Sequence, residues 1–140
     1  MSFSNISFIL HKPQLSENIG ACARAIKNFN FKKLVIINPK PIFPNDKIIA
    51  TSAGAREIVN NAKVYENLEP AIKKIDYLIA TTSRFRNKNL KHINLNNLSK
   101  LILAKRLHFY LAQKPQVFQI MKLVMLIVLC KYLLILVLNH

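Results

Sequence analysis

Residues 7–37 read SFILHKPQLSENIGACARAIKNFNFKKLVII, and this stretch predicts two strands with a helix between them. The apolar runs at 7–10 and 33–37 are short and bounded by polar residues and proline, which is typical of strands buried on both faces. Between them, apolar residues recur at helical spacing from Ile19 to Phe29, after polar residues at 16–18 that are able to cap a helix start. This order predicts a parallel pair of strands joined by a crossover helix.

The same alternation continues to about residue 98. Gly54 separates two short helical segments, and a proline-rich loop precedes them. We therefore predict the α/β class, a parallel sheet with helices on both faces. Ligands bind such sheets at the carboxyl ends of the strands, so the loops after Leu10, Ile37 and Ala80 are expected at the functional edge. The further predicted elements are helices at 46–53, 55–60 and 68–74 and strands at 63–65 and 76–80.

The length of 140 residues suits one compact domain. Two cysteines, Cys22 and Cys130, are too few for a disulfide framework or a zinc site, and we expect no metal. Cys22 lies among small residues of the predicted helix, which favours a buried free thiol. The first ten residues lack the basic start and the long apolar run of a signal peptide, so a cytoplasmic location is expected.

The formal net charge of +15 indicates a polyanionic partner, most often nucleic acid. The charge is unevenly distributed along the chain. Residues 1–76 carry eleven Lys/Arg and all six acids, whereas residues 77–140 carry ten Lys/Arg and no acid. Folded domains normally mix both signs on their surface.

Residues 99–140 differ from the rest of the chain, because they contain neither glycine nor acid. Residues 123–138 are apolar except for Lys131 and Tyr132. This run is shorter than the roughly 20 residues that a membrane helix needs, and it contains a lysine, so a membrane anchor is an alternative with less support. We expect two regions, a domain at 1–98 and an aberrant basic and apolar tail at 99–140.

The first predicted helix combines features that suit an anion. Gly20 allows backbone or a ligand to approach closely, and the free N–H groups of a helix start favour negative charge. Arg24 follows one turn later with a guanidinium fork suited to phosphate, although a solvated surface arginine is the simpler interpretation. The last predicted strand runs into hydroxyl and basic side chains, namely Thr81, Thr82, Ser83, Arg84, Arg86, Lys88 and Lys91.

Four segments in this order and spacing, NIGACARAIKNF at 18–29, KKLVIINPK at 32–40, TSAGAREIVNNAKVYENLEPAI at 51–72 and DYLIATTSRFRN at 76–87, carry a family resemblance. They are similar to the SpoU branch of the SPOUT RNA methyltransferases, and most of all to the TrmJ-type tRNA (cytidine/uridine-2′-O-)-methyltransferases. The resemblance covers roughly residues 6–87.

This resemblance implies an α/β knot fold, S-adenosylmethionine as methyl donor, RNA (most often tRNA) as substrate and a homodimer. It implies catalytic roles for Asn18 and Arg24, with Arg24 beside the target ribose. It also implies that Thr81, Thr82 and Ser83 touch the donor and that Arg84, Arg86 and Lys88 contact RNA.

The family is expected to continue with a Gly-x-Glu-x-x-Gly-Leu segment and a knotted lobe, which are not legible here. A shifted reading frame, in which the third base of each codon is read with the first two bases of the next from Leu107 onward, permits the Gly-x-Glu-x-x-Gly part of that segment. The codon that spans Phe109 and Tyr110 must then encode Leu, and the codon that spans Met121 and Lys122 must encode Glu. The other spanning codons are less constrained, and together they permit Phe-Leu-Phe-Gly-Pro-Glu-Thr-Ser-Gly-Phe-Ser-Asn-His-Glu-Ile. We therefore predict a frameshift between Leu98 and Leu107, with loss of the knotted part, of the dimer and of half the donor pocket.

The chain as translated is thus expected to be an inactive version of the methyltransferase. Two alternatives are a non-catalytic basic fragment that still binds RNA and a small tail-anchored membrane protein. Under the frameshift hypothesis the apolar tail is an exposed liability that promotes aggregation.

Overall fold

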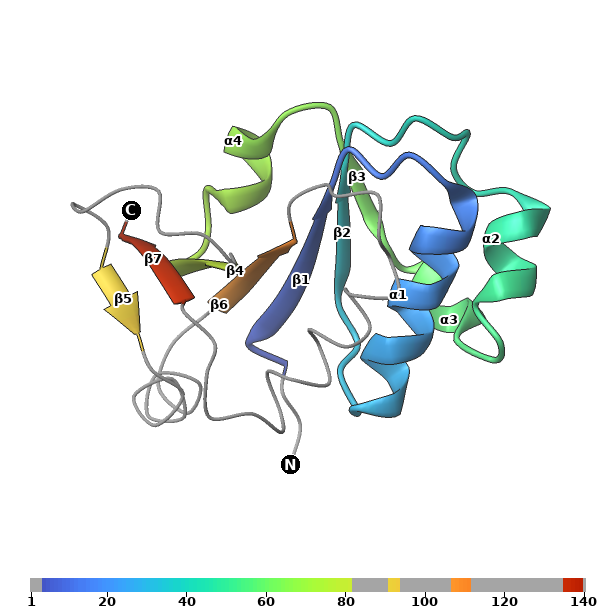
Figure 1. Ribbon diagram of the computed structural model, residues 1–140, viewed down its shortest axis with the longest axis horizontal. Helices are drawn as coiled ribbons and strands as arrows, with labels where there is room; N and C mark the ends of the chain where they lie inside the picture. The colour runs from blue at the N-terminus through green and yellow to red at the C-terminus, as the bar shows by residue number, and fades with distance from the viewer. Residues whose placement is uncertain (1–3, 82–90, 94–106, 112–134, 140) are drawn as a thin grey trace.

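The computed structural model of the chain describes residues 4–81, 91–93, 107–111 and 135–139 (Figure 1). Strands and helices alternate up to Thr81, and three further strands follow. The elements are β1 (Ile6–His11), α1 (Ser16–Asn28), β2 (Leu34–Ile37), α2 (Asp46–Thr51), α3 (Arg56–Asn60), β3 (Lys63–Tyr65), α4 (Leu68–Ile72), β4 (Tyr77–Thr81), β5 (Lys91–Ile93), β6 (Leu107–Leu111) and β7 (Ile135–Asn139).

Every helix and strand predicted between residues 7 and 80 is present, with bounds shifted by at most three residues. The break between α2 and α3 falls where it is predicted, at Gly54, whose φ is +83°. The expectation that residues 16–18 cap α1 is wrong. The helix begins at Ser16, and its N-cap residue Leu15 makes no side-chain bond to it.

Seven strands form one sheet in the order β3-β2-β1-β6-β4-β7-β5. The first five are parallel to one another, and a parallel sheet is the one predicted. β7 is antiparallel to both β4 and β5, so the sheet is mixed at one edge. β6 lies in the middle, where Phe109 is in register with Phe8 of β1 and with Ile79 of β4.

The sequence does not predict β5, β6 or β7. For β7 the reason is that the chain beyond Pro115 lacks the turn residues that mark the ends of strands, so one continuous apolar run hides where a strand begins. β7 ends the apolar run at 123–138, and residues 123–134 of that run lie outside the described part of the chain. Among the described residues, no helix has the length and apolar character that crossing a membrane requires.

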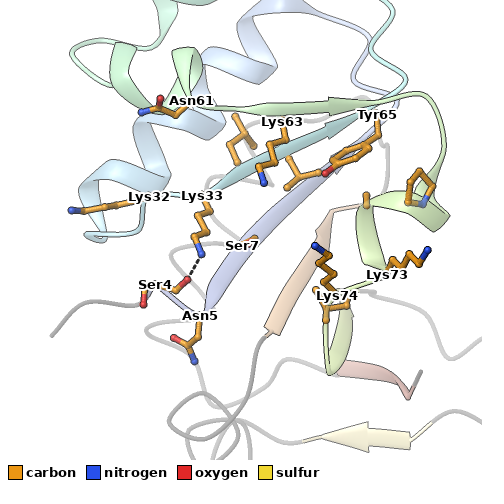
Figure 2. A pocket seen from close by; sticks show the side chains of 15 residues that line it. Ser4, Asn5, Ser7, Lys32, Lys33, Asn61, Lys63, Tyr65, Lys73 and Lys74 are labelled. Carbon is orange, nitrogen blue, oxygen red and sulfur yellow. Dashed lines mark hydrogen bonds between the residues drawn. The ribbon is translucent and has the colours of Figure 1, made fainter.

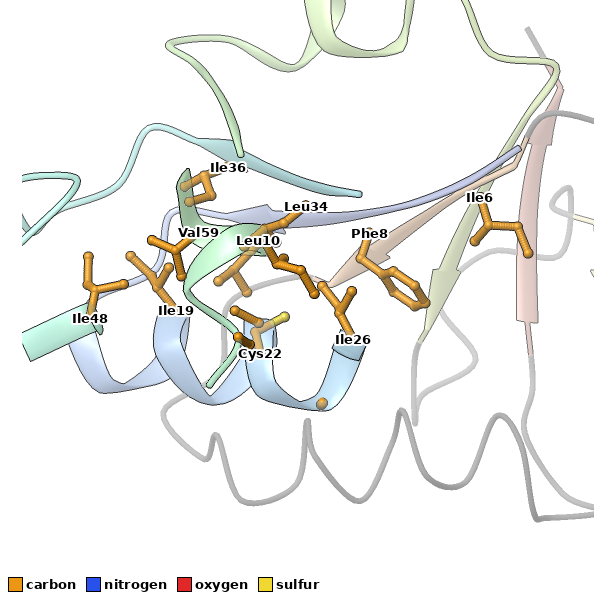
Figure 3. Close-up of a cluster of buried hydrophobic side chains, with 14 of the residues drawn as sticks. Ile6, Phe8, Leu10, Ile19, Cys22, Ile26, Leu34, Ile36, Ile48 and Val59 are labelled. Carbon is orange, nitrogen blue, oxygen red and sulfur yellow. The ribbon is translucent and has the colours of Figure 1, made fainter. Parts of the chain in front are cut away.

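The two faces of the sheet are covered by different helices. Successive strand side chains point to opposite faces, so Phe8 and Leu10 of β1 pack with α1, α2 and α3, whereas Ile9 packs with α4. Figure 3 shows the larger core, in which Ile19 and Cys22 of α1 face the sheet. Helices on both faces confirm the predicted α/β architecture.

Candidate functional site

The carboxyl ends of β1, β2 and β3 meet at one edge of the sheet, where backbone hydrogen bonds tie the following loops together. The N–H of Lys12 donates to the carbonyl of Ile37 at 2.7 Å, and that of Asn38 donates to Tyr65 at 2.8 Å. Lys12 and Asn38 both have positive φ, which turns the chain sharply as it leaves each strand. The N–H of Lys40 donates to the Pro13 carbonyl at 3.0 Å and joins the two loops.

α1 begins at this edge and carries both predicted catalytic residues, each half-buried. Asn18 lies in the first turn, where its N–H donates to the Leu15 carbonyl at 3.2 Å. Arg24 lies six residues later, about 9 Å along the axis at 1.5 Å per residue. Side chains of a helix tilt toward its N-terminus, so Arg24 leans back toward the same edge. The structure thus places both residues on the element that starts at the functional edge.

Gly20 allows close packing between α1 and α2. A Cβ at this position would lie 2.0 Å from Oγ1 of Thr51 and 2.6 Å from the carbonyl oxygen of Ile48. The sequence predicts that Gly20 allows either backbone or a ligand to approach closely. The structure shows the close approach of backbone. The glycine sets how closely α2 and its preceding loop lie against the start of α1.

Asn45 is a positioning residue that sequence reasoning missed. Its Oδ1 accepts from the N–H of Ile48 at 3.0 Å and caps α2. Its Nδ2 donates to Oγ of Ser16 at 3.0 Å and to the Ile42 carbonyl at 2.7 Å. One side chain thus joins the starts of α1 and α2. The Asn-Asp pair before an apolar helical run signals the cap, but nothing local signals the bond to Ser16.

The chain matches the model of the SpoU rRNA methylase family over residues 5–107. It belongs to that family. The tRNA (cytidine-2′-O-)-methyltransferase TrmJ of Methanocaldococcus jannaschii is 40% identical over 89 residues, which are 63% of this chain and 38% of that protein. An uncharacterized tRNA/rRNA methyltransferase of Haemophilus influenzae is 35% identical over 83 residues, 59% of this chain and 34% of that protein.

Solved structures agree with the SpoU fold. A probable methylase family protein from Haemophilus influenzae Rd KW20 superposes with a TM-score of 0.73 at 25% identity, over 94% of this chain and 54% of that one. TrmJ from Z. mobilis gives a TM-score of 0.66 at 23% identity, over 84% of this chain and 66% of that one. The chain spans little more than a third of the length of its curated relatives.

One of the other predicted site residues of the SpoU domain, Thr81, lies at the end of β4. Thr81 is the last residue of this strand, and its backbone is in register with Ile135 of β7. β4 neighbours β6, which neighbours β1, so its carboxyl end belongs to the same edge as the start of α1. The remaining predicted residues, Thr82, Ser83, Arg84, Arg86 and Lys88, lie outside the described residues.

Two titratable side chains near the start of α1, Glu17 and His11, have shifted pKa values. Lys47 Nζ lies 2.5 Å from Oε1 of Glu17, and this hydrogen bond lowers the pKa of Glu17. Both side chains are well exposed, so the pair contributes little to stability. Partial burial, followed by the charge of Lys12, lowers the pKa of His11 below its usual 6.5. His11 is therefore neutral at pH 7 at the end of β1.

Cys22 is fully buried, and burial raises the pKa of its thiol to about 12. A thiol in this state is unreactive, which confirms the prediction of a buried free cysteine. Within the described part of the chain, no group of His, Cys, Asp or Glu side chains is able to hold a metal ion.

Proposed function

We propose that this domain is built for S-adenosylmethionine-dependent 2′-O-methylation of RNA, with tRNA in the cytoplasm as the substrate. The observation that carries the proposal is the placement of Asn18 and Arg24 on the helix that starts at the carboxyl edge of a SpoU-type sheet. TrmJ, the relative with 40% identity, bears the name of a tRNA 2′-O-methyltransferase.

Transfer to a ribose requires the 2′-hydroxyl to be aimed at the methyl group and to lose its proton as the bond forms. S-adenosylmethionine supplies an electrophilic methyl group when it is bound. Arg24 is a poor base, because its guanidinium is not deprotonated in proteins. We assign it to clamping an RNA phosphate and to stabilising the developing alkoxide, both electrostatic tasks. Asn18, at the edge itself, offers amide hydrogen bonds that orient the ribose.

Thr81, Thr82 and Ser83 are proposed to hold the donor. Thr81 ends β4 at the functional edge, which is where ligands of such sheets bind, so its place fits this role. Arg84, Arg86 and Lys88 follow directly in sequence and are proposed to contact RNA phosphates.

We further propose that the reading frame changes between Leu98 and Leu107, and that the chain as translated is an inactive version of the enzyme. Two observations support this. The family match ends at residue 107, within the predicted interval. β6 lies between β1 and β4, and the shifted frame permits Gly-Pro-Glu immediately after Leu111, at its carboxyl end. The shift therefore removes side chains from the middle of the functional edge.

An RNA-binding fragment without catalysis is the second candidate function. The net charge of +15 favours it, since phosphate contacts need no donor pocket. Under this candidate the family homodimer is lost, so the chain is expected to sediment as a monomer.

The first experiment is to resequence the coding DNA across codons 95–125. Predicted Glu and Gly codons in the shifted frame support the frameshift, and their absence would refute it. The second step compares the chain with a frame-restored version for donor binding by calorimetry and for tRNA methylation. We expect both only in the restored protein.

Within the restored protein, Arg24→Ala is expected to abolish methylation while leaving donor binding intact. Arg56→Ala is the matched control, because Arg56 is an exposed arginine on α3. Equal activity in the two variants would overturn the role of Arg24.

A further inference from the structure

A large hollow opens on the face of the sheet that α4 covers, beside the amino-terminal halves of β1 and β2 and along the whole of β3. Its volume is about 750 Å³, within the range of ligand sites of roughly 300–1,000 Å³. β1 separates it from the functional edge by about five residues, roughly 16 Å at 3.3 Å per residue. It is lined by Ser4, Asn5, Ser7, Lys32, Lys33, Leu34, Val35, Asn61, Lys63, Tyr65, Pro70, Ala71, Lys73, Lys74 and Ile75.

The charge around the hollow is of one sign. Five of the eleven basic residues of the first 76 line it, whereas none of the six acids does. All five are lysines with exposed side chains. They come from the loop before β2, from β3 and from the end of α4, so only the fold brings them together. Such a concentration of cations favours a ligand that carries several negative charges.

Figure 2 shows how these lysines are arranged. Lys63 of β3 and Lys74 beyond α4 extend toward the space between the two elements. Lys33 donates a hydrogen bond to the carbonyl of Ser4, which fixes its ammonium at the lower rim. Because the lysines come from three separate segments around the hollow, an extended polyanion can pair with more of them than one compact anion can.

The floor of the hollow is apolar, unlike the floor of a site that takes phosphate alone. Val35 and Ala71 are buried there, and Ile75 is partly buried. The half-buried ring of Tyr65 lies at the upper end, beside α4 (Figure 2). An aromatic ring and an apolar floor next to cations are the elements by which proteins hold single-stranded nucleic acid, with bases stacked and phosphates paired.

We propose that this hollow binds a single-stranded segment of RNA, with its phosphates on Lys33, Lys63 and Lys74 and a base against Tyr65. Along β1 and β2 the site lies away from the proposed methyl-transfer edge, and at Tyr65 it extends to the carboxyl end of β3. It needs neither the donor nor Arg24. It gives the chain a second RNA contact, which remains when the donor pocket is incomplete.

The test measures binding of the full chain to a labelled oligouridylate of roughly 15 nucleotides, close to the upper site size of single-strand-binding domains. Fluorescence anisotropy follows binding between about 50 and 200 mM salt, where phosphate contacts dominate. The variant Lys63→Gln/Lys74→Gln removes two rim charges. The matched control Lys47→Gln/Arg56→Gln removes two exposed charges from α2 and α3, which cover the opposite face.

Each single-strand phosphate contact contributes about 0.7 to the slope of log affinity against log salt. Loss of two contacts should lower the slope by about 1.4 and raise Kd about 25-fold near 0.1 M salt. The control should keep the wild-type slope. Equal losses in both variants would show that binding follows net charge alone, and no loss in the rim variant would show that RNA binds elsewhere. Either result overturns the proposal.

Competition identifies the source of the phosphates. Uridine monophosphate at the same nucleotide concentration should compete far less well than the oligomer. Equal competition by the monophosphate would indicate a mononucleotide site. Displacement by polyglutamate of matched charge would indicate a surface that binds any polyanion. Either result would contradict the proposal. Because the assay contains no donor, a failure of methylation in the frame-restored protein leaves this result unaffected.

Discussion

Gly20→Ala tests the packing that positions α1 at the functional edge. In an exposed helix this change stabilises by about 1 kcal/mol, because alanine is the better helix former. Here the added Cβ would lie 2.0 Å from Thr51 Oγ1, 2.6 Å from the Ile48 carbonyl oxygen and 2.9 Å from the Ser52 nitrogen. The hydroxyl is able to rotate away, but the other two atoms belong to the backbone. The shortfall at the Ile48 oxygen is 0.8 Å against an ordinary contact of 3.4 Å.

α2 must therefore move away from α1, and the fully buried Ile48 moves with it. Overpacking of this kind costs typically about 1–3 kcal/mol, and loosening of Ile48 adds to it. Two backbone atoms are in the way, so we take the upper end of this range, about 3 kcal/mol, which the propensity gain of about 1 kcal/mol reduces to a net loss of about 2 kcal/mol. This corresponds to a shift of about 1 M in the midpoint of urea unfolding, at a slope of about 2 kcal/mol per M.

Two companion variants make the measurement specific. Gly54→Ala meets only Lys27 Nζ at 3.7 Å, so its cost comes from the positive φ alone and should be about 1–2 kcal/mol. Gly20→Ala/Thr51→Ala removes the nearest side-chain atom but not the two backbone contacts, so it should recover little stability. A Gly20→Ala protein as stable as the wild type would refute the close approach of α1 and α2.

Three further predictions concern other contacts. Asn45→Ala should cost about 1–2 kcal/mol by loss of the α2 cap, whereas Asn45→Asp keeps the acceptor and should cost less, both measured by urea unfolding. Because the folded-state pKa of His11 lies below 6.5, the folded chain should lose stability as pH falls from 6.5 through that pKa, and His11→Gln should reduce this loss. In a Cys130→Ser background, Cys22 should resist a thiol reagent at pH 8 until the chain is unfolded, because its pKa is about 12.

Most elements up to Thr81 follow from local pattern, because β1, β2 and β4 are short apolar runs and α1 has a clear apolar period. The contacts between elements do not follow. Gly20 marks a close approach, but only the structure shows that Ile48 and Thr51 make it. The lysines of the hollow look like scattered surface charge in the sequence, since they come from three separate segments, at 32–33, 63 and 73–74. Their convergence depends on the order of β1, β2 and β3 in the sheet.

β6 shows why a shift of frame affects the fold and the site differently. Residues 107–111 read Leu-His-Phe-Tyr-Leu in the translated frame, and the shifted frame permits Phe-Leu-Phe at the same place. A strand in the middle of a parallel sheet needs a mostly apolar run. The translated frame supplies one that is interrupted only by His108, and the shifted frame permits one. The position between β1 and β4 is therefore filled in either case. The proposed donor site does not accept such a change of sequence after Leu111, because it depends on particular side chains and turns rather than on apolar character. This difference is the physical reason to expect a chain that keeps the SpoU sheet and loses the family reaction.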